Sequence, residues 1–178
     1  MAFADPVKNI TKLSLHPGMV VADMGCGSGM YSLLSAGRVG GSGMVYAIDI
    51  QQDILTALSN TAKREELTNI ETIHGDVDEH GGTYVKDGIC DALIISNILF
   101  QSEKKEGLAK EAFRIAKEGG KTLVIDWSDS FGNLGPTSDM VYSEAEARVL
   151  FEKAGFSFQD RFSAGDHHYG LLFMKGKT

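Results

Sequence analysis

Three glycines at alternate positions, Gly25, Gly27 and Gly29, have the clearest potential for binding chemistry in this sequence. They follow an apolar run and precede a segment with helical spacing. Glycine lets the backbone pass within contact distance of a ligand and adopt positive φ angles. The free amides at the start of the following helix attract a carboxylate or a phosphate. A tight, closely packed turn would also explain the glycines, so the loop alone does not identify a ligand.

Acidic side chains end the next two apolar runs along the chain. Asp49 lies 20 residues after Gly29, where a carboxylate can accept hydrogen bonds from both hydroxyls of a ribose. Asp76 ends the third run and is placed to reach an adenine amino group. Each acid alone could be a solvated strand end. Three consecutive strands that end in suitable groups favour a shared binding site.

These residues need a scaffold that brings the strand ends to one edge. Near-continuously apolar strands separated by helices predict an α/β fold with a parallel sheet covered on both faces and right-handed crossovers. In such a doubly wound sheet, ligands bind at the carboxyl ends of the strands. The expected strands are 19–25, 44–50, 70–76, 91–97 and 121–127, and the expected helices are 28–38, 51–67, 102–118 and 143–154.

Local signals mark several boundaries. Ser143 and Glu146 form a predicted capping box at a helix start. Gly155 suits the left-handed cap after that helix, and Gly119-Gly120 is expected to cap the helix before it. Residues 156–176 read as two strands joined by a short turn, which predicts antiparallel pairing at one edge. Segment 128–142 contains the longest stretch without predicted structure and is a candidate lid.

The composition limits the class of protein. We expect 178 residues to form one domain, 1–178, with an N-terminal segment at 1–18. The sequence has neither an apolar run long enough to span a membrane nor the layout of a signal peptide. A net charge of −7 argues against a broad nucleic-acid-binding surface. Two cysteines make neither a disulfide framework nor a metal cluster, and a cytoplasmic location is the simplest expectation.

The glycine spacing bears on the kind of cofactor. The dinucleotide fingerprint G-x-G-x-x-G requires a third glycine where this sequence has Met30. Asp23 instead extends the pattern to D-x-G-x-G-x-G. A nicotinamide- or nucleotide-dependent oxidoreductase therefore stays open as an alternative, although its fingerprint is incomplete.

The sequence resembles the class I S-adenosyl-L-methionine-dependent methyltransferases. The resemblance is carried by the segments "ADMGCGSG", "VYAIDI", "HGDV" and "DALIISNILF" and covers the chain from about Leu13 to Met174. Two longer segments, "LHPGMVVADMGCGSGMYS" and "VIDWSDS…GP…SEAEARVLFEKAGF", resemble small bacterial and archaeal members akin to the quinone-biosynthesis methyltransferases. The resemblance implies a three-layer αβα sandwich with seven strands in the order 3-2-1-4-5-7-6, the seventh being antiparallel.

The same resemblance implies that the cofactor is S-adenosyl-L-methionine, which leaves as S-adenosyl-L-homocysteine. It places the methionine part of the cofactor against Gly25, Cys26, Gly27 and Gly29, with Asp23 supporting the ammonium group. Cys26 itself is more simply a compact space-filling residue than a reactive thiol.

For the rest of the cofactor, the resemblance implies contacts by residues at the ends of the second to fourth strands. Asp49 would hold the ribose and Ile50 would pack on the adenine. Asp76 would bind the adenine amino group, next to Val77, which would offer an amide or an apolar contact. Asn97 would line the cofactor near the reacting sulfur.

Catalysis by this family needs little more than alignment, because the methyl group is already activated on a sulfonium. Alignment alone can lower a barrier by roughly 7–11 kcal/mol in favourable cases. We therefore assign no catalytic residue. Candidate bases are Asp126, Asp129, His74, His167 and His168, for each of which a surface or strand-end role is the favoured interpretation.

The acceptor pocket is expected to involve Tyr31, Phe100 and Trp127, although ordinary packing would also explain Tyr31 and Trp127. The fourth strand lacks the Asn/Asp-Pro-Pro-aromatic signature of enzymes that methylate amide or exocyclic nitrogens. Arsenic-methylating relatives rely on several thiols, and this chain has two. These features favour a small-molecule acceptor. A cofactor-binding protein without catalysis stays open, as do the methylated atom and the oligomeric state.

Overall fold

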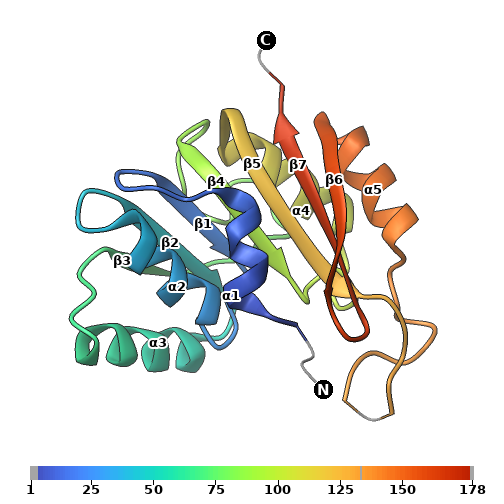
Figure 1. Cartoon of the computed structure of the whole chain (residues 1–178), viewed down its shortest axis with the longest axis horizontal. Helices are drawn as coiled ribbons and strands as arrows, with labels where there is room; N and C mark the ends of the chain where they lie inside the picture. Colours follow the sequence, from blue (N-terminus) through green and yellow to red (C-terminus); the bar gives the residue numbers. More distant parts are fainter. Residues whose placement is uncertain (1–3, 133, 177–178) are drawn as a thin grey trace.

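The strands form one seven-stranded sheet in the order β3-β2-β1-β4-β5-β7-β6 (Figure 1). The computed structural model describes residues 4–132 and 134–176. Strand β7 pairs antiparallel with both β5 and β6, whereas the other pairings are parallel. Both the strand order and the antiparallel strand confirm the fold that the resemblance implied. The strands are β1 Val20–Met24, β2 Met44–Asp49, β3 Ile70–His74, β4 Cys90–Ser96, β5 Ala116–Trp127, β6 Phe156–Gly165 and β7 His168–Lys175.

Helices cover both faces of this sheet, which gives the expected three layers. Alternate residues of β4 show why: Ile94 packs in the core on one face, and Leu93 and Ile95 pack on the other. Because both faces are buried, the strand is apolar at nearly every position. The first face carries α1 Pro6–Asn9, η1 Ile10–Leu13, α2 Met30–Val39 and α3 Gln52–Arg64, and the second carries α4 Lys105–Ile115 and α5 Glu144–Lys153.

The boundary between α4 and β5 differs from the prediction. Helix α4 ends at Ile115, and β5 begins at Ala116, so Gly119 and Gly120 lie inside a strand and cap no helix. They stand at a register shift of the β4–β5 pairing, between Cys90 and Ala92. A Cβ on Gly120 would lie 2.9 Å from the Cys90 carbonyl oxygen. The two glycines therefore let the backbone of β5 bulge at this register shift and pass close to β4.

The other local predictions are confirmed. The Ser143 hydroxyl accepts from the Glu146 amide, and the Glu146 carboxylate accepts from the Ser143 amide at 2.9 Å, which completes the capping box of α5. Gly155 follows that helix with a φ of 110°. The C-terminal strands β6 and β7 form the predicted antiparallel hairpin.

The candidate lid is tied to this hairpin. The Asp129 carboxylate lies 2.7 Å from Nδ1 of His167, whose ring stacks on Phe131. Gly135 of the same segment lies against the Trp127 indole, because a Cβ there would come within 2.8 Å of the ring. Among the described residues of 128–142, none lines the pocket that lies where β1, β2, β3 and β4 end. None of the helices described is both long and apolar enough to cross a membrane.

Candidate cofactor site

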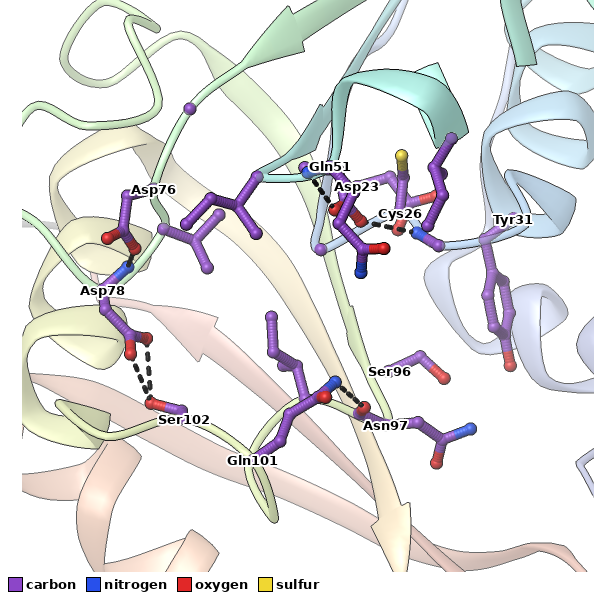
Figure 2. Close-up of a pocket in the computed structure, with 18 of the residues that line it drawn as sticks. Asp23, Cys26, Tyr31, Gln51, Asp76, Asp78, Ser96, Asn97, Gln101 and Ser102 are labelled. Carbon is purple, nitrogen blue, oxygen red and sulfur yellow. Dashed lines mark hydrogen bonds between the residues drawn. The ribbon is translucent and has the colours of Figure 1, made fainter. Parts of the chain in front are cut away.

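A pocket of about 640 Å³ lies where β1, β2, β3 and β4 end, within the usual size range of small-molecule sites (Figure 2). We call it the carboxyl-end pocket. All of the expected cofactor-binding residues except Gly29 line it, as does Tyr31 of the expected acceptor pocket. The lining residues that were predicted are Asp23, Gly25, Cys26, Gly27, Tyr31, Asp49, Ile50, Asp76, Val77 and Asn97.

The glycine loop is fixed by hydrogen bonds to β2. The amides of Gly25 and Cys26 both donate to the Ile48 carbonyl, at 2.8 and 2.9 Å. Gly27 has a φ of 49°, and a Cβ built on it would meet no atom within 4 Å. Its bare backbone therefore faces open space in the pocket, so a ligand can approach this backbone closely.

Gly29 has a different role. It is the N-cap of α2 with a φ of 75°, and a Cβ on it would lie 2.4 Å from Leu58 Cδ1 of α3. The absence of a side chain here is explained by helix packing.

Asp23 lies at the floor of the pocket and is 2% exposed. Burial raises the pKa of its carboxyl to about 6, although the Ser32 hydroxyl donates to it at 2.6 Å and opposes the shift. A cation bound beside this carboxylate would offset the cost of burying the charge.

Asp49 and Ile50 follow at the end of β2. The Asp49 carboxylate accepts from the amides of Gly27 at 3.0 Å and Gln51 at 2.9 Å, which fixes the side chain between the two loops. Each carboxylate oxygen keeps a further lone pair for a ligand hydroxyl. Ile50 is 63% exposed at the pocket, so a planar apolar ring could cover it.

Asp76 lies two residues beyond β3 and accepts from the Asp78 amide at 2.9 Å. The Asp78 carboxylate in turn accepts from the Ser102 hydroxyl at 2.8 Å and the Lys104 amide at 3.2 Å. Glu79 also forms an ion pair with Lys104. These contacts hold the segment after β3 against the segment before α4 and wall off one end of the pocket (Figure 2).

Asn97 begins the turn after β4 and has a φ of 57°, a conformation that asparagine tolerates better than most residues. Its Oδ1 is buried and has no hydrogen-bond partner. The turn is held by Asp126, which is fully buried and accepts from the Leu99 and Trp127 amides at 2.8 Å. Burial raises the pKa of Asp126 to about 6, against the backbone hydrogen bonds from Trp127, Leu99, Phe100 and Ile98.

The remaining candidates lie outside this pocket. Phe100 and Trp127 do not line it; Trp127 is 8% exposed and packs against the His168 ring at 4.2 Å. Neither His74, whose Nε2 lies 2.9 Å from the Ile50 carbonyl, nor His167 lines it. The described residues contain no group of three or more His, Cys, Asp or Glu side chains that could hold a metal ion.

A family model described as a methyltransferase domain matches residues 15–159, which is most of the chain. The chain belongs to the methyltransferase domain family. This match contains the glycine loop, Asp49, Asp76 and Asn97. Together with the seven-stranded order, it identifies a class I S-adenosyl-L-methionine-dependent methyltransferase domain.

Individual relatives agree with this assignment. The chain is 29% identical over 117 residues to an arsenite methyltransferase of Aquipseudomonas alcaligenes, a match that covers 64% of this chain and 34% of the relative. It is 28% identical over 116 residues to a demethylmenaquinone methyltransferase of Bacillus mycoides, covering 65% and 48%. The methyltransferase domain thus spans between a third and half of the length of these curated relatives.

A solved structure of a SAM-dependent methyltransferase from Aquifex aeolicus is similar over nearly the whole length. The TM-score is 0.86 at 26% identity, and the match covers 97% of this chain and 90% of the other. None of these comparisons supports the oxidoreductase alternative.

Sequence reasoning missed part of the pocket of this methyltransferase domain. Asp78 follows Asp76 closely in sequence, but its partner Ser102 is 24 residues away, so only the fold brings them together. Ala4 and Pro6 also line the pocket, because the Asp5 amide donates to the Ala164 carbonyl of β6 at 3.1 Å and anchors the N-terminal segment. That anchor joins the two ends of the chain, and no short-range sequence signal marks it.

Proposed function

We propose that this protein transfers a methyl group from S-adenosyl-L-methionine to a small-molecule acceptor. The observation that carries the proposal is the meeting of three features in one pocket: the bare backbone of Gly27, the Asp49 carboxylate and the Asp76 carboxylate. These features lie on three separate strand ends and suit the methionine, ribose and adenine parts of one molecule.

The residues present fit that cofactor. Ile50 offers an exposed apolar surface for a purine ring, and Asp49 is held by two backbone amides that leave it able to accept ribose hydroxyls. Asp23 offers a buried carboxylate to an ammonium group. When bound, the cofactor supplies a methyl group activated on a sulfonium. The residues of the chain then bind it, exclude water and align an acceptor, which can account for much of the acceleration.

The charge of the pocket supports a cationic cofactor. The lining residues include six carboxylates and a single ammonium group, that of Lys104, which is paired with Glu79. Such a lining attracts the sulfonium and ammonium of S-adenosyl-L-methionine and disfavours the two phosphates of a dinucleotide.

The thiols bear on the acceptor. Cys26 lines the pocket, while Cys90 is buried elsewhere in the core, and both are free. Burial raises the pKa of both thiols, that of Cys90 to about 12. The protonated thiols are poor nucleophiles and metal ligands, so we infer an acceptor other than arsenite. Free cysteines also suit the cytoplasmic location that we propose.

Isothermal titration with S-adenosyl-L-homocysteine tests the proposal. We expect micromolar binding, and we expect Asp49→Ala to weaken it by about 1–3 kcal/mol, because a charged acceptor of hydrogen bonds is lost. Asp53→Ala is the matched control, since Asp53 is exposed in the first turn of α3 and does not line the pocket.

Folded protein that binds NADH but not S-adenosyl-L-homocysteine would overturn the proposal. Binding of S-adenosyl-L-homocysteine that is unaffected by Asp49→Ala would show that the ribose assignment is wrong.

A further inference from the structure

A groove on the molecular surface lies between α4 and α5, which both cover the same face of the sheet (Figure 1). Its volume is about 490 Å³, and among the described residues it shares no lining side chain with the carboxyl-end pocket. We call it the α4–α5 groove. None of the expected cofactor contacts and none of the candidate bases lines it, so the proposed function leaves the groove unexplained.

The floor of the α4–α5 groove is apolar. Ala109 of α4 and Leu150 of α5 are buried beneath it, and Val149 lies beside them with 48% of its surface exposed. Ala145 and Ala154 also line the groove, and because their side chains end at Cβ, another helix can approach the backbone of α5 closely. Covering this apolar floor with a protein surface would remove it from water, which is favourable.

Charged side chains give the groove two unlike ends. Strands β4, β5 and β6 all run in the same direction, so α4 and α5 both start at the carboxyl edge of the sheet and run parallel to each other. Glu106 and Glu146 lie in the first turns of the two helices, whereas Lys110 and Lys153 lie further along them. The groove therefore has an acidic end and a basic end.

These charges are available to an external partner. Within the described part of the chain, Glu106, Lys110 and Lys153 form no ion pair. The Glu146 carboxylate accepts from the Ser143 amide and hydroxyl through Oε2, which leaves its Oε1 for another donor. A surface that fits this groove should therefore carry a basic group over the acidic end and an acidic group over the basic end.

A groove with unlike ends is complementary to its own copy after a half-turn. A two-fold axis perpendicular to the groove lays the acidic end of one copy on the basic end of the other, and each contact then occurs twice. The midpoint between Glu146 and Lys153 falls between Val149 and Leu150, so two antiparallel α5 helices bring Glu146 opposite Lys153 at both ends. In the same arrangement, Val149 of each copy lies over the apolar floor of the other.

We propose that the α4–α5 groove is the interface of a symmetric dimer, in which α5 of a second copy of this chain lies antiparallel in the groove. A second copy is the partner because one sequence then supplies both charged ends in the matching order. Exposed ion pairs are weak, and the net charge of −7 on each copy opposes association. We therefore expect a reversible dimer with a dissociation constant of about 10–100 µM, as for a small transient interface.

Sedimentation equilibrium of the whole chain measures this association. Protein concentrations should run from about one tenth to about ten times the expected dissociation constant. We expect the average mass to rise with concentration from that of the 19.2 kDa chain towards twice that value.

Charge reversal at the two ends tests the arrangement. Lys153→Glu places two carboxylates opposite each other at both ends, and Glu146→Lys places two ammonium groups there. Each variant alone should raise the dissociation constant at least about tenfold, because two attractive contacts become repulsive. An equal mixture of the two variants should form a mixed dimer about as tightly as the native chain dimerises, because a carboxylate again faces an ammonium group at both ends.

Lys63→Glu is the matched control, because Lys63 is exposed in the last turn of α3, outside the groove, and undergoes the same change of charge. It should alter the dissociation constant by no more than about twofold. Glu146→Lys also removes the capping-box carboxylate, so its melting temperature should fall, and circular dichroism checks that it is folded. The mixture separates this loss of stability from the loss of charge complementarity, since only complementary charges can restore the dimer.

A native chain that stays monomeric throughout the concentration range, including one whose groove is kept for a different protein, overturns the proposal. A dimer that persists in both single variants, or a mixture that associates no more tightly than either variant alone, shows that another surface is used and also overturns it. None of these outcomes depends on cofactor binding, so the proposed function is tested separately.

Discussion

Replacing Asp23 by asparagine should stabilise the protein and weaken its cofactor binding at the same time. The carboxyl is 2% exposed, and burial raises its pKa from 3.8 to about 6. In the folded state the charged form is therefore disfavoured relative to the unfolded chain. As the pH rises, the carboxyl ionises in the unfolded chain before it ionises in the folded protein. The free energy of unfolding therefore falls between about pH 4 and pH 6 and stays at the lower value above pH 6.

The size of the effect follows from the shift. About two pKa units correspond to about 3 kcal/mol at pH 7.5 and to about half of that at pH 5. Asparagine avoids this cost and can still accept from the Ser32 hydroxyl, whose hydrogen bond to the carboxylate is already contained in the net shift. We expect Asp23→Asn to raise the free energy of unfolding by about 3 kcal/mol at pH 7.5 and by about half of that at pH 5.

Urea unfolding of the cofactor-free protein at both pH values measures the effect. The comparison between the variant and the native protein removes the contributions of other titrating groups, such as Asp126 and Glu111, which are present in both. Ser32→Ala is the matched control, because it removes the hydrogen bond that holds the carboxylate and leaves the carboxylate in place. It should destabilise the protein most at the higher pH.

The same substitution should weaken cofactor binding, although it stabilises the fold. Without the carboxylate, S-adenosyl-L-methionine should bind about 1–3 kcal/mol more weakly, because its ammonium loses a charged partner. In the native protein at pH 6, the bound cation lowers the pKa of Asp23, so binding should release a proton and its enthalpy should depend on the buffer. A variant that is destabilised equally at both pH values, or that binds the cofactor as well as the native protein, would refute this reasoning.

Three further substitutions probe the parts that position the site. Gly29→Ala should lower the free energy of unfolding by about 2–3 kcal/mol, because its Cβ would lie 2.4 Å from Leu58 Cδ1. Gly37→Ala is the control: its Cβ would meet no atom within 4 Å, and it should raise the free energy of unfolding by about 0.5–1 kcal/mol. Urea unfolding measures both changes. Asp126→Asn should cost about 2–4 kcal/mol at pH 5, since an amide NH₂ would face backbone N–H donors, and less at pH 8, where ionisation of the carboxyl with its raised pKa already lowers the free energy of unfolding of the native protein; an equal cost at both would contradict the pKa assignment. Ser143→Ala should cost about 1 kcal/mol through loss of the α5 cap, detectable as a drop in melting temperature, and no drop would mean the capping box contributes little.

The sequence predicts the sheet well because each strand carries its own signal. A run such as 91–97 is apolar at successive positions, because alternate side chains pack in the cores on opposite faces of the sheet. A strand covered by helices on both faces has this pattern. Residues at the strand ends could be placed for the same reason, since parallel strands deliver Asp49 and Asn97 to one edge wherever their side chains point. The helical spacing of 102–118 was misleading, because the bulge opposite Cys90 is a property of the β4–β5 pair and not of either segment.

Contacts between distant segments could not be predicted in this way. The position of Asp126 at a strand end predicts a candidate base. In the structure its carboxylate is buried and accepts hydrogen bonds from amides of the turn after β4. Similarly, Trp127 sits under Gly135 and beside His168, and neither neighbour is marked by sequence spacing. In both cases the role of the side chain depends on a partner from another element, which only the packed structure supplies.

The glycine loop shows how a motif can be correct as a whole while its members act differently. Gly29 is needed for the packing of α2 on α3, and Gly25 lies against the Ile98 side chain. Gly27 alone of the three faces open space, and its amide holds the Asp49 carboxylate. A single residue therefore connects the glycine loop to the end of β2, the two parts of the pocket that we propose for the methionine and the ribose. For this reason, a side chain at position 27 should affect the cofactor more than the fold, and one at position 29 should affect the fold more than the cofactor.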